Sequence, residues 1–220
     1  KIMSSMDDES IEVEGALSRE KIRSFMKMFL VSMEEREQIL RPLAEGGQEA
    51  VGSMGDDTPM AVLSVKDRSF YDYFRQQFAQ VTNPPIDPLR ETLVMSLKTQ
   101  LGREGNIFLE SPEHAKRINL SSPVLSPRKY YALKNNTQDD YRVKKFSVNY
   151  DPKTSNLEQA VQSLCEKVSD AVRDGIRCCI LSDSDILPNN LPIQMLMAVG
   201  AVHHHLIKLG LRCDANIIAS

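Results

Sequence analysis

The last third of the chain alternates between strand-like and helix-like segments, and this alternation constrains the fold more than any other feature of the sequence. The segments are, in order, an alternating strand over 143–151, an amphipathic helix over 156–175, a strand buried on both faces over 176–183, a buried helix over 191–210 and a strand over 212–219. Strands separated by single helices pair in parallel, because each helix carries the chain back across the sheet. The pattern therefore predicts a parallel sheet with right-handed crossovers.

The first 50 residues are predicted to form a helical lead-in. Ser18 can cap a helix over 18–32 whose apolar residues recur at helical spacing. Ser32 and Glu35 form a capping box for a second helix over 32–45, and Gly46 and Gly47 follow it.

The middle of the chain mixes helices with apolar extended segments. Aromatic residues at helical spacing predict an amphipathic helix over 70–80. Pro88 opens a short helix, buried extended segments are expected after it and again at 106–110, and a turn with a helix is expected over 121–133. Residues 134–142 are predicted to be a mobile surface loop.

The predicted fold class is α/β, with a mostly parallel β-sheet and flanking helices. It is Rossmann-like in its C-terminal part and carries an N-terminal helical portion. The expected divisions are the lead-in over 1–50, an α/β part over 51–140 and the alternating part over 141–220. Because the chain begins with Lys1 and stops inside a strand-like segment, we expect it to be a piece of a longer polypeptide.

Charge and hydropathy exclude several classes of partner. A net charge of -3 argues against nucleic acid, and the densest basic stretch, 142–145, is interpreted as a solvated face. The longest nearly uncharged apolar stretch starts at Pro192 and is far shorter than the roughly 18 residues of a membrane span. No signal peptide is visible, so a cytoplasmic location is expected, with a plastid possible for a plant or algal chain.

The four cysteines do not form a metal or redox motif. None of them stands in a C-x-x-C arrangement, and the two adjacent ones should point to opposite faces of a strand. All four are interpreted as small buried hydrophobes in a reducing compartment: Cys165, Cys178, Cys179 and Cys213.

Three polar clusters are candidates for ligand binding. Asp183 and Asp185 follow a parallel strand, where α/β folds place ligands and paired carboxylates can hold magnesium, although such residues also form turns and caps. Asp56 and Asp57 form an acidic loop, for which a turn and cap before Pro59 is the favoured interpretation and ligand binding the weaker one. The run His203-His204-His205 cannot converge on one ion from a helix, so a hydrogen-bonded structural role is expected for at least one of these residues.

A stiff polar corner stands out at Thr82-Asn83, directly before Pro84-Pro85. Each proline fixes its own φ and drives the preceding residue towards an extended conformation. The Thr82 hydroxyl and the Asn83 amide would thus be held in place at low entropic cost. The chain has no G-x-G-x-x-G, phosphate-loop or G-x-S-x-G motif, and the corner alone is equally compatible with a helix terminator.

Four long phrases resemble one family. "GSMGDDTPMAVLS", "YDYFRQQFAQVTNPPIDPLRETLVMSL", "INLSSPVLSP" and "AVGAVHHHLIKLGLR" together are similar to the central domain of the glutamate synthase large subunit. The similarity is strongest over residues 52–127 and 176–212. That family tends to have arginine where Ser184 follows Asp183 here.

The resemblance implies a multidomain oxidoreductase that makes two glutamates from glutamine and 2-oxoglutarate. In that enzyme a glutaminase domain releases ammonia, and a barrel domain with FMN and an iron–sulfur cluster uses it, with NAD(P)H or ferredoxin as electron donor. The central domain is a scaffold between these two partner domains of the same polypeptide. A small reductase subunit or ferredoxin is a further possible partner of the parent enzyme.

The family also suggests a role for the stiff corner, since it implies that Thr82 and Asn83 line an ammonia tunnel. It implies no catalytic residue, cofactor or metal for this piece itself. Two alternatives stay open on the sequence: a magnesium-dependent small-molecule enzyme that uses Asp183 and Asp185, and a pure interaction domain.

Overall fold

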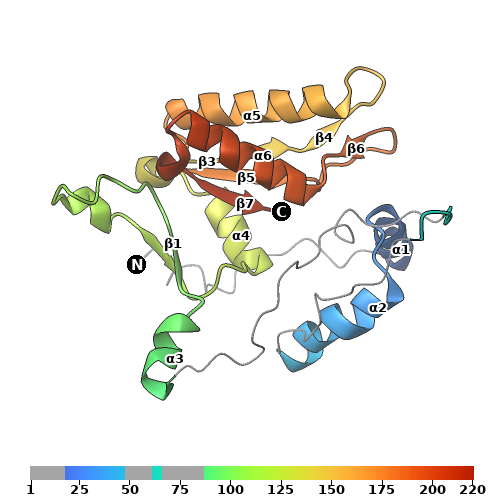
Figure 1. The fold of residues 1–220 in the computed structure, drawn as a ribbon, viewed down its shortest axis with the longest axis horizontal. Coiled ribbons are helices and arrows are strands. Elements are labelled where there is room, and N and C mark those ends of the chain that lie inside the picture. Colours follow the sequence, from blue (N-terminus) through green and yellow to red (C-terminus); the bar gives the residue numbers. More distant parts are fainter. Residues whose placement is uncertain (1–17, 48–60, 66–86) are drawn as a thin grey trace. The chain divides into compact units, whose positions relative to one another are not determined.

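A computed structural model describes residues 18–47, 61–65 and 87–220 (Figure 1). The chain divides into two compact units, and each is considered separately. The described part of the larger unit is Pro88–Ser220, and that of the smaller one lies within Glu14–Asp87. Among the described residues, no helix is both long and apolar enough to cross a membrane.

A parallel three-stranded sheet organises the larger unit. Its strands stand in the order β3-β5-β7 and have the bounds β3 Val143–Ser147, β5 Cys178–Ser182 and β7 Asn216–Ala219. The connecting helices, α5 (Leu157–Arg173) and α6 (Met195–Lys208), pack together on one face of the sheet, and α4 (Pro127–Lys134) lies on the other (Figure 1). Both crossovers therefore have the same hand. The predicted α/β fold with a parallel sheet is confirmed.

The central strand β5 holds the two cores together. All five of its residues are buried, as a strand covered on both faces requires. Cys179 and Leu181 join the core beneath α5 and α6, whereas Cys178 joins a second core with Leu133 and Tyr141. The two adjacent cysteines thus face opposite sides of the sheet, as predicted. Each fully buried large apolar side chain contributes about 1.5–3 kcal/mol to stability.

Helix α5 begins and ends where its sequence predicts. The Asn156 side chain accepts a bond from the Gln159 backbone N–H at 2.9 Å, and the Gln159 side chain accepts one from the Asn156 N–H at 3.1 Å. Buried residues recur on one face of the helix at Leu164, Val168 and Val172. Gly175 follows the helix with a φ of 91°, a conformation that other residues seldom adopt.

Three boundaries in this region differ from the prediction. The strand expected over 143–151 divides at Val148, and its second part, β4 (Asn149–Tyr150), pairs antiparallel with β6 (Leu191–Pro192). The helix expected from residue 191 therefore begins only at Met195. Pro192 explains the delay, since the residue before a proline avoids the helical region. Strand β7 is likewise shorter than expected, because a 3₁₀ turn, η7 (Arg212–Asp214), precedes it.

The segments that lead into the sheet are short. Pro88 opens α3 (Pro88–Val94), as predicted. Strand β1 (Thr99–Leu101) pairs antiparallel with β2 (Ile118–Leu120), and a 3₁₀ turn, η5 (Pro112–Ala115), lies between them. A further 3₁₀ turn, η6 (Asp139–Tyr141), lies in the predicted surface loop and buries Tyr141.

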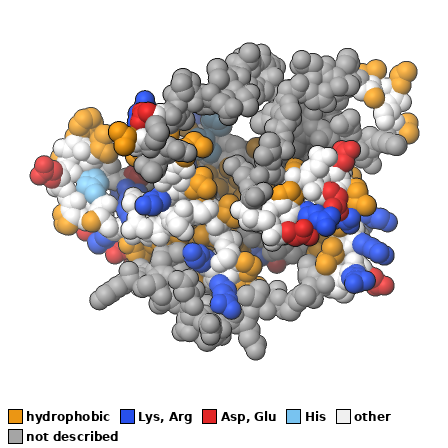
Figure 2. All heavy atoms as spheres, turned by 90° about the horizontal axis from the view of Figure 1, so that it is seen from below, with side chains coloured by type: hydrophobic (Ala, Val, Ile, Leu, Met, Phe, Trp, Pro, Cys, Tyr) orange, Lys and Arg blue, Asp and Glu red, His pale blue; other side chains and the backbone are white. Residues whose placement is uncertain are grey.

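The prediction of a buried extended segment at 106–110 is wrong. Ile107 and Phe108 are 85% and 88% exposed, and the segment is a turn. The Asn106 side chain accepts a hydrogen bond from the Phe108 N–H at 3.0 Å, a local bond that competes with strand pairing. Apolar side chains also reach the surface next to charged ones on the face shown in Figure 2.

The described part of the smaller unit is mainly helical. Ser18 caps α1 (Arg19–Met28), and the predicted capping box of Ser32 and Glu35 opens α2 (Met33–Glu35). The helix continues with the wider π-type turns η2 (Arg36–Leu40) and η3 (Pro42–Gly46) and ends at Gly47, whose φ is 58°. The helix predicted over 70–80 lies outside the described residues.

Candidate functional site

Four of the candidate residues cannot be placed. Thr82 and Asn83 at the stiff corner, and Asp56 and Asp57 in the acidic loop, lie outside the described residues.

The carboxyl edge of the sheet gathers the polar residues that follow β5. Lys145 of β3 points to this edge, and its ammonium group donates to Asp185 Oδ2 at 2.6 Å and to Ser184 Oγ at 2.9 Å. The Ser184 hydroxyl lies 2.9 Å from the hydroxyl of the buried Ser182. Lys145 was predicted to be part of a solvated basic face, but its side chain is only 22% exposed. The cluster is thus a partly exposed ion pair, with Lys145 half-buried and Asp185 64% exposed, supported by two hydroxyl groups.

Asp183 and Asp185 have different electrostatic surroundings. The hydrogen bond from Lys145 holds the pKa of Asp185 below its usual value. Burial raises the pKa of Asp183, against the opposing effects of a backbone hydrogen bond and of Lys145.

This arrangement bears on the magnesium hypothesis. The Lys145 ammonium stands beside the Asp185 carboxylate that the ion would need. In the part of the chain that the structure describes, no group of three His, Cys, Asp or Glu side chains is placed to hold a metal ion. The residues that the magnesium alternative would use as ligands therefore form a lysine–aspartate ion pair instead of a set of metal ligands.

The histidine run has a structural member, as expected. His203 Nδ1 accepts a hydrogen bond from Arg212 Nε at 2.8 Å, and Arg212 also donates to the Ala215 carbonyl at 2.8 Å. These bonds connect α6 to the turn that precedes β7. His204 is exposed and packs edge-on against the His203 ring.

The cysteines follow the prediction with one exception. Cys165, Cys178 and Cys179 are free and buried, and burial raises the pKa of Cys178 to about 11 and that of Cys179 to about 12. Cys213 was predicted to be buried but is exposed. It lies in η7, whose 3₁₀ turn replaces the start of the predicted strand.

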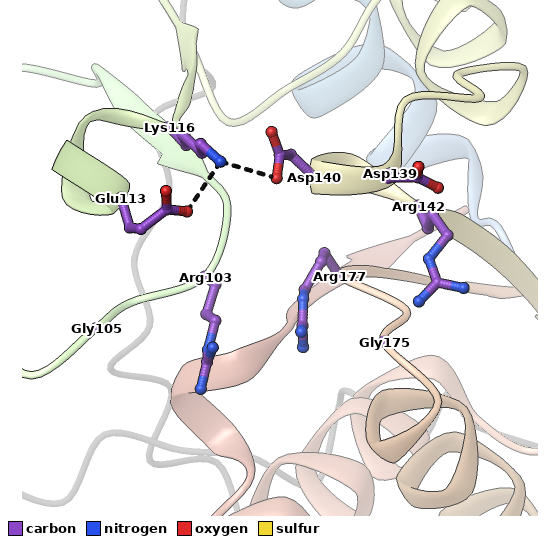
Figure 3. Close-up of a pocket in the computed structure, with 9 residues that line it drawn as sticks. All are labelled: Arg103, Gly105, Glu113, Lys116, Asp139, Asp140, Arg142, Gly175 and Arg177. Atoms are coloured by element: carbon purple, nitrogen blue, oxygen red, sulfur yellow. Dashed lines mark hydrogen bonds and ion pairs between the residues drawn. The ribbon is translucent and has the colours of Figure 1, made fainter.

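The opposite edge of the sheet carries a cavity that sequence reasoning missed. This amino-edge pocket has a volume of about 210 Å³ and is lined by Arg103, Gly105, Glu113, Lys116, Asp139, Asp140, Arg142, Gly175 and Arg177 (Figure 3). Arg142 directly precedes β3 and Arg177 directly precedes β5. The available signal in the sequence was an arginine at or directly before the start of each of two predicted parallel strands, because parallel strands start at the same edge of a sheet.

Fold and site together define the class of protein: an α/β domain whose Lys145, Ser184 and Asp185 form a hydrogen-bonded cluster at the carboxyl edge of the sheet. A model of the glutamate synthase central domain matches residues 24–220 of this chain. The chain belongs to the glutamate synthase central domain family. The match includes residues 128–175, where the resemblance seen in the sequence was weakest.

Long enzymes named as glutamate synthases contain a similar segment. The chain is 42% identical over 209 residues to a chloroplastic ferredoxin-dependent glutamate synthase of Oryza sativa subsp. japonica, covering 93% of this chain and 13% of that protein. It is 42% identical over 201 residues to the large chain of the NADPH glutamate synthase of Azospirillum brasilense, covering 91% and 13%. The corresponding protein of Bacillus subtilis (strain 168) is 41% identical over 192 residues, with 87% and 12% covered. The chain thus spans about an eighth of the length of these relatives.

Proposed function

We propose that this chain is the scaffold domain of a glutamate synthase, joining a glutaminase domain to an FMN-containing barrel domain of the same polypeptide. The parent enzyme would make two glutamates from glutamine and 2-oxoglutarate. The observation that carries the proposal is the family match over residues 24–220, combined with the small share of each relative that the chain covers. The two internally packed cores suit a domain that holds others in place.

We further propose that Thr82 and Asn83 line the path of ammonia between the two partner domains. Ammonia needs hydrogen-bonding groups along its way, whereas a loose, water-filled channel would let it be protonated and lost. The double proline Pro84-Pro85 would keep a hydroxyl and an amide in fixed positions at this wall.

The cofactors of the parent enzyme belong to its other domains in this proposal. FMN and an iron–sulfur cluster would lie in the barrel domain, with NAD(P)H or ferredoxin as electron donor. Relatives named for ferredoxin and for NADPH are both 42% identical to the chain, so similarity in this domain does not separate the donors. A reductase subunit or ferredoxin would be the external partner, in the cytoplasm or in a plastid.

The test uses the full-length enzyme with Thr82→Val, which removes the hydroxyl and keeps the side-chain volume. Glutamine hydrolysis and glutamate formation are measured together, with free ammonia as a third readout. We expect hydrolysis to continue while glutamate formed per glutamine falls and ammonia escapes. The matched control is Thr137→Val, at an exposed threonine of the larger unit.

If Thr82→Val left the amount of glutamate formed per glutamine hydrolysed unchanged, the tunnel role would be rejected. The domain would then be a scaffold without a role in ammonia channelling. A separate measurement addresses the scaffold itself. The 220-residue chain alone should show neither glutaminase turnover nor flavin absorbance. Detecting either signal would contradict the assignment of the catalytic steps to the other domains.

A further inference from the structure

The arginine side chains of the amino-edge pocket are separated from its carboxylates, whereas the Lys116 ammonium lies among them. In Figure 3 the carboxylates of Glu113, Asp139 and Asp140 lie towards one end, and the guanidinium groups of Arg103, Arg142 and Arg177 extend towards the other. The guanidinium end is therefore a local concentration of positive charge on a chain whose net charge is -3.

Two of the four cations are neutralised by carboxylates. Lys116 lies 2.9 Å from Glu113 and 3.3 Å from Asp140, and Arg103 lies 2.6 Å from Asp214 of η7. These pairs hold the walls of the pocket together.

Arg142 and Arg177 have different partners. Arg142 donates to the Asp174 carbonyl at 2.6 Å, and Arg177 donates to the Asp214 carbonyl at 3.3 Å. Carbonyl groups orient a guanidinium but do not cancel its charge, and in the described part of the chain neither arginine forms an ion pair. A guanidinium has five N–H donors, so most of those on Arg142 and Arg177 are available for a ligand.

The Arg142 side chain packs against the backbone at Gly175. A Cβ on Gly175 would collide with the Arg142 guanidinium, and the positive φ of Gly175 also favours glycine. The Arg142 carbonyl accepts the Arg177 N–H at 2.8 Å, which places the starts of the two strands side by side. Two guanidinium groups are thus oriented in one cavity by the fold itself.

We propose that the amino-edge pocket binds a small oxyanion of the phosphate class through Arg142 and Arg177. Two uncompensated guanidinium groups suit the charge of a phosphate group, about −1.5 to −2 near neutral pH, and their planar donors suit its oxygens. The volume of about 210 Å³ is below the range of about 300–1,000 Å³ found for pockets that hold larger organic ligands. The carboxylates at the other end would repel a longer anion. The inference is independent of the role of Thr82 and Asn83.

The test titrates inorganic phosphate against full-length glutamate synthase while hydrogen exchange is followed by mass spectrometry. Potassium chloride at matched ionic strength is the reference. We expect phosphate to slow exchange in the peptides covering 139–142 and 174–178. Arg142→Gln and Arg177→Gln should each weaken this effect at least about tenfold, the loss expected for a charge-assisted contact. Arg128→Gln, at an exposed arginine that does not line the pocket, is the matched control.

Arg142→Lys guards against an effect of misfolding, because it keeps the charge and loses the planar fork. It should bind phosphate more weakly than the parent enzyme, with unchanged exchange in β5. The proposal fails if chloride protects as well as phosphate, or if the glutamine variants titrate like the parent. It also fails if the pocket is protected without phosphate and chemical cross-links show an acidic segment of another domain inside it.

Discussion

Replacing Leu206 with alanine tests whether the core beneath α5 and α6 holds the larger unit together. Leu206 is fully buried on the inner face of α6, in one core with Val202 and Leu181. Leu→Ala at such sites costs about 2–5 kcal/mol, because both transfer free energy and cavity terms are lost, and we expect about 3 kcal/mol. Leu196 of the same helix is 41% exposed, so the same substitution there should cost only about 1 kcal/mol.

The difference is measurable in a urea titration of the 220-residue chain. With an m-value of about 2 kcal/mol/M, a difference of about 2 kcal/mol separates the two midpoints by about 1 M urea. Circular dichroism follows the loss of helix, and hydrogen exchange of β5 reports the larger unit directly. Equal destabilisation by Leu206→Ala and Leu196→Ala would refute the packing argument, because burial would then not determine the cost.

Three further predictions follow from local geometry. Asn156→Ala should cost about 1 kcal/mol of unfolding free energy by removing the capping box of α5, and circular dichroism in urea measures this loss. Iodoacetamide should modify the exposed Cys213 in the folded chain and leave Cys178 and Cys179 unmodified, because these two are buried and their pKa values are raised; mass spectrometry detects each adduct. Asp183 has a raised pKa when folded, so the stability it contributes is present below about pH 4 and is lost as the pH rises through that pKa. Asp183→Asn should therefore gain stability relative to the parent chain between about pH 4 and pH 7, and thermal melts that keep a constant difference would contradict this sign.

Local sequence signals predicted the elements that depend on near neighbours. The capping residues Ser18 and Ser32 mark helix starts because the bonds they make reach only three residues along the chain. The uninterrupted apolar run of β5 predicted a central strand because burial on both faces leaves no polar alternation.

The errors arose where a distant partner or a competing local hydrogen bond decides the structure. Asn149 and Pro192 pair in the short antiparallel β4–β6 ladder, and no local sequence pattern predicts that these two segments pair. The apolar residues Ile107 and Phe108 were predicted to be buried, but the side chain of Asn106 stabilises a turn instead. Apolarity indicates a tendency to burial, whereas actual burial requires a neighbouring element to pack against.

The candidate sites divide in the same way. Asp185 was correctly placed at the carboxyl edge, but Lys145, its partner there, comes from another strand. The pocket at the amino edge escaped prediction because Arg103, Arg142 and Arg177 come from three separate parts of the chain. Only the parallel pairing of β3 and β5 reveals that two of these arginines start neighbouring strands.

The two edges of the sheet therefore have opposite chemical characters. Ligands of open α/β sheets usually bind at the carboxyl ends of the strands, where helix starts and loops converge. Here Lys145, Ser184 and Asp185 satisfy one another at that edge, so a ligand would have to break an existing ion pair before it could bind. At the amino edge, Arg142 and Arg177 are oriented by neutral carbonyl groups and retain their full charge. An incoming anion gains new charge-assisted bonds there without displacing a carboxylate, which is why the amino edge is the better candidate for a binding site in this domain.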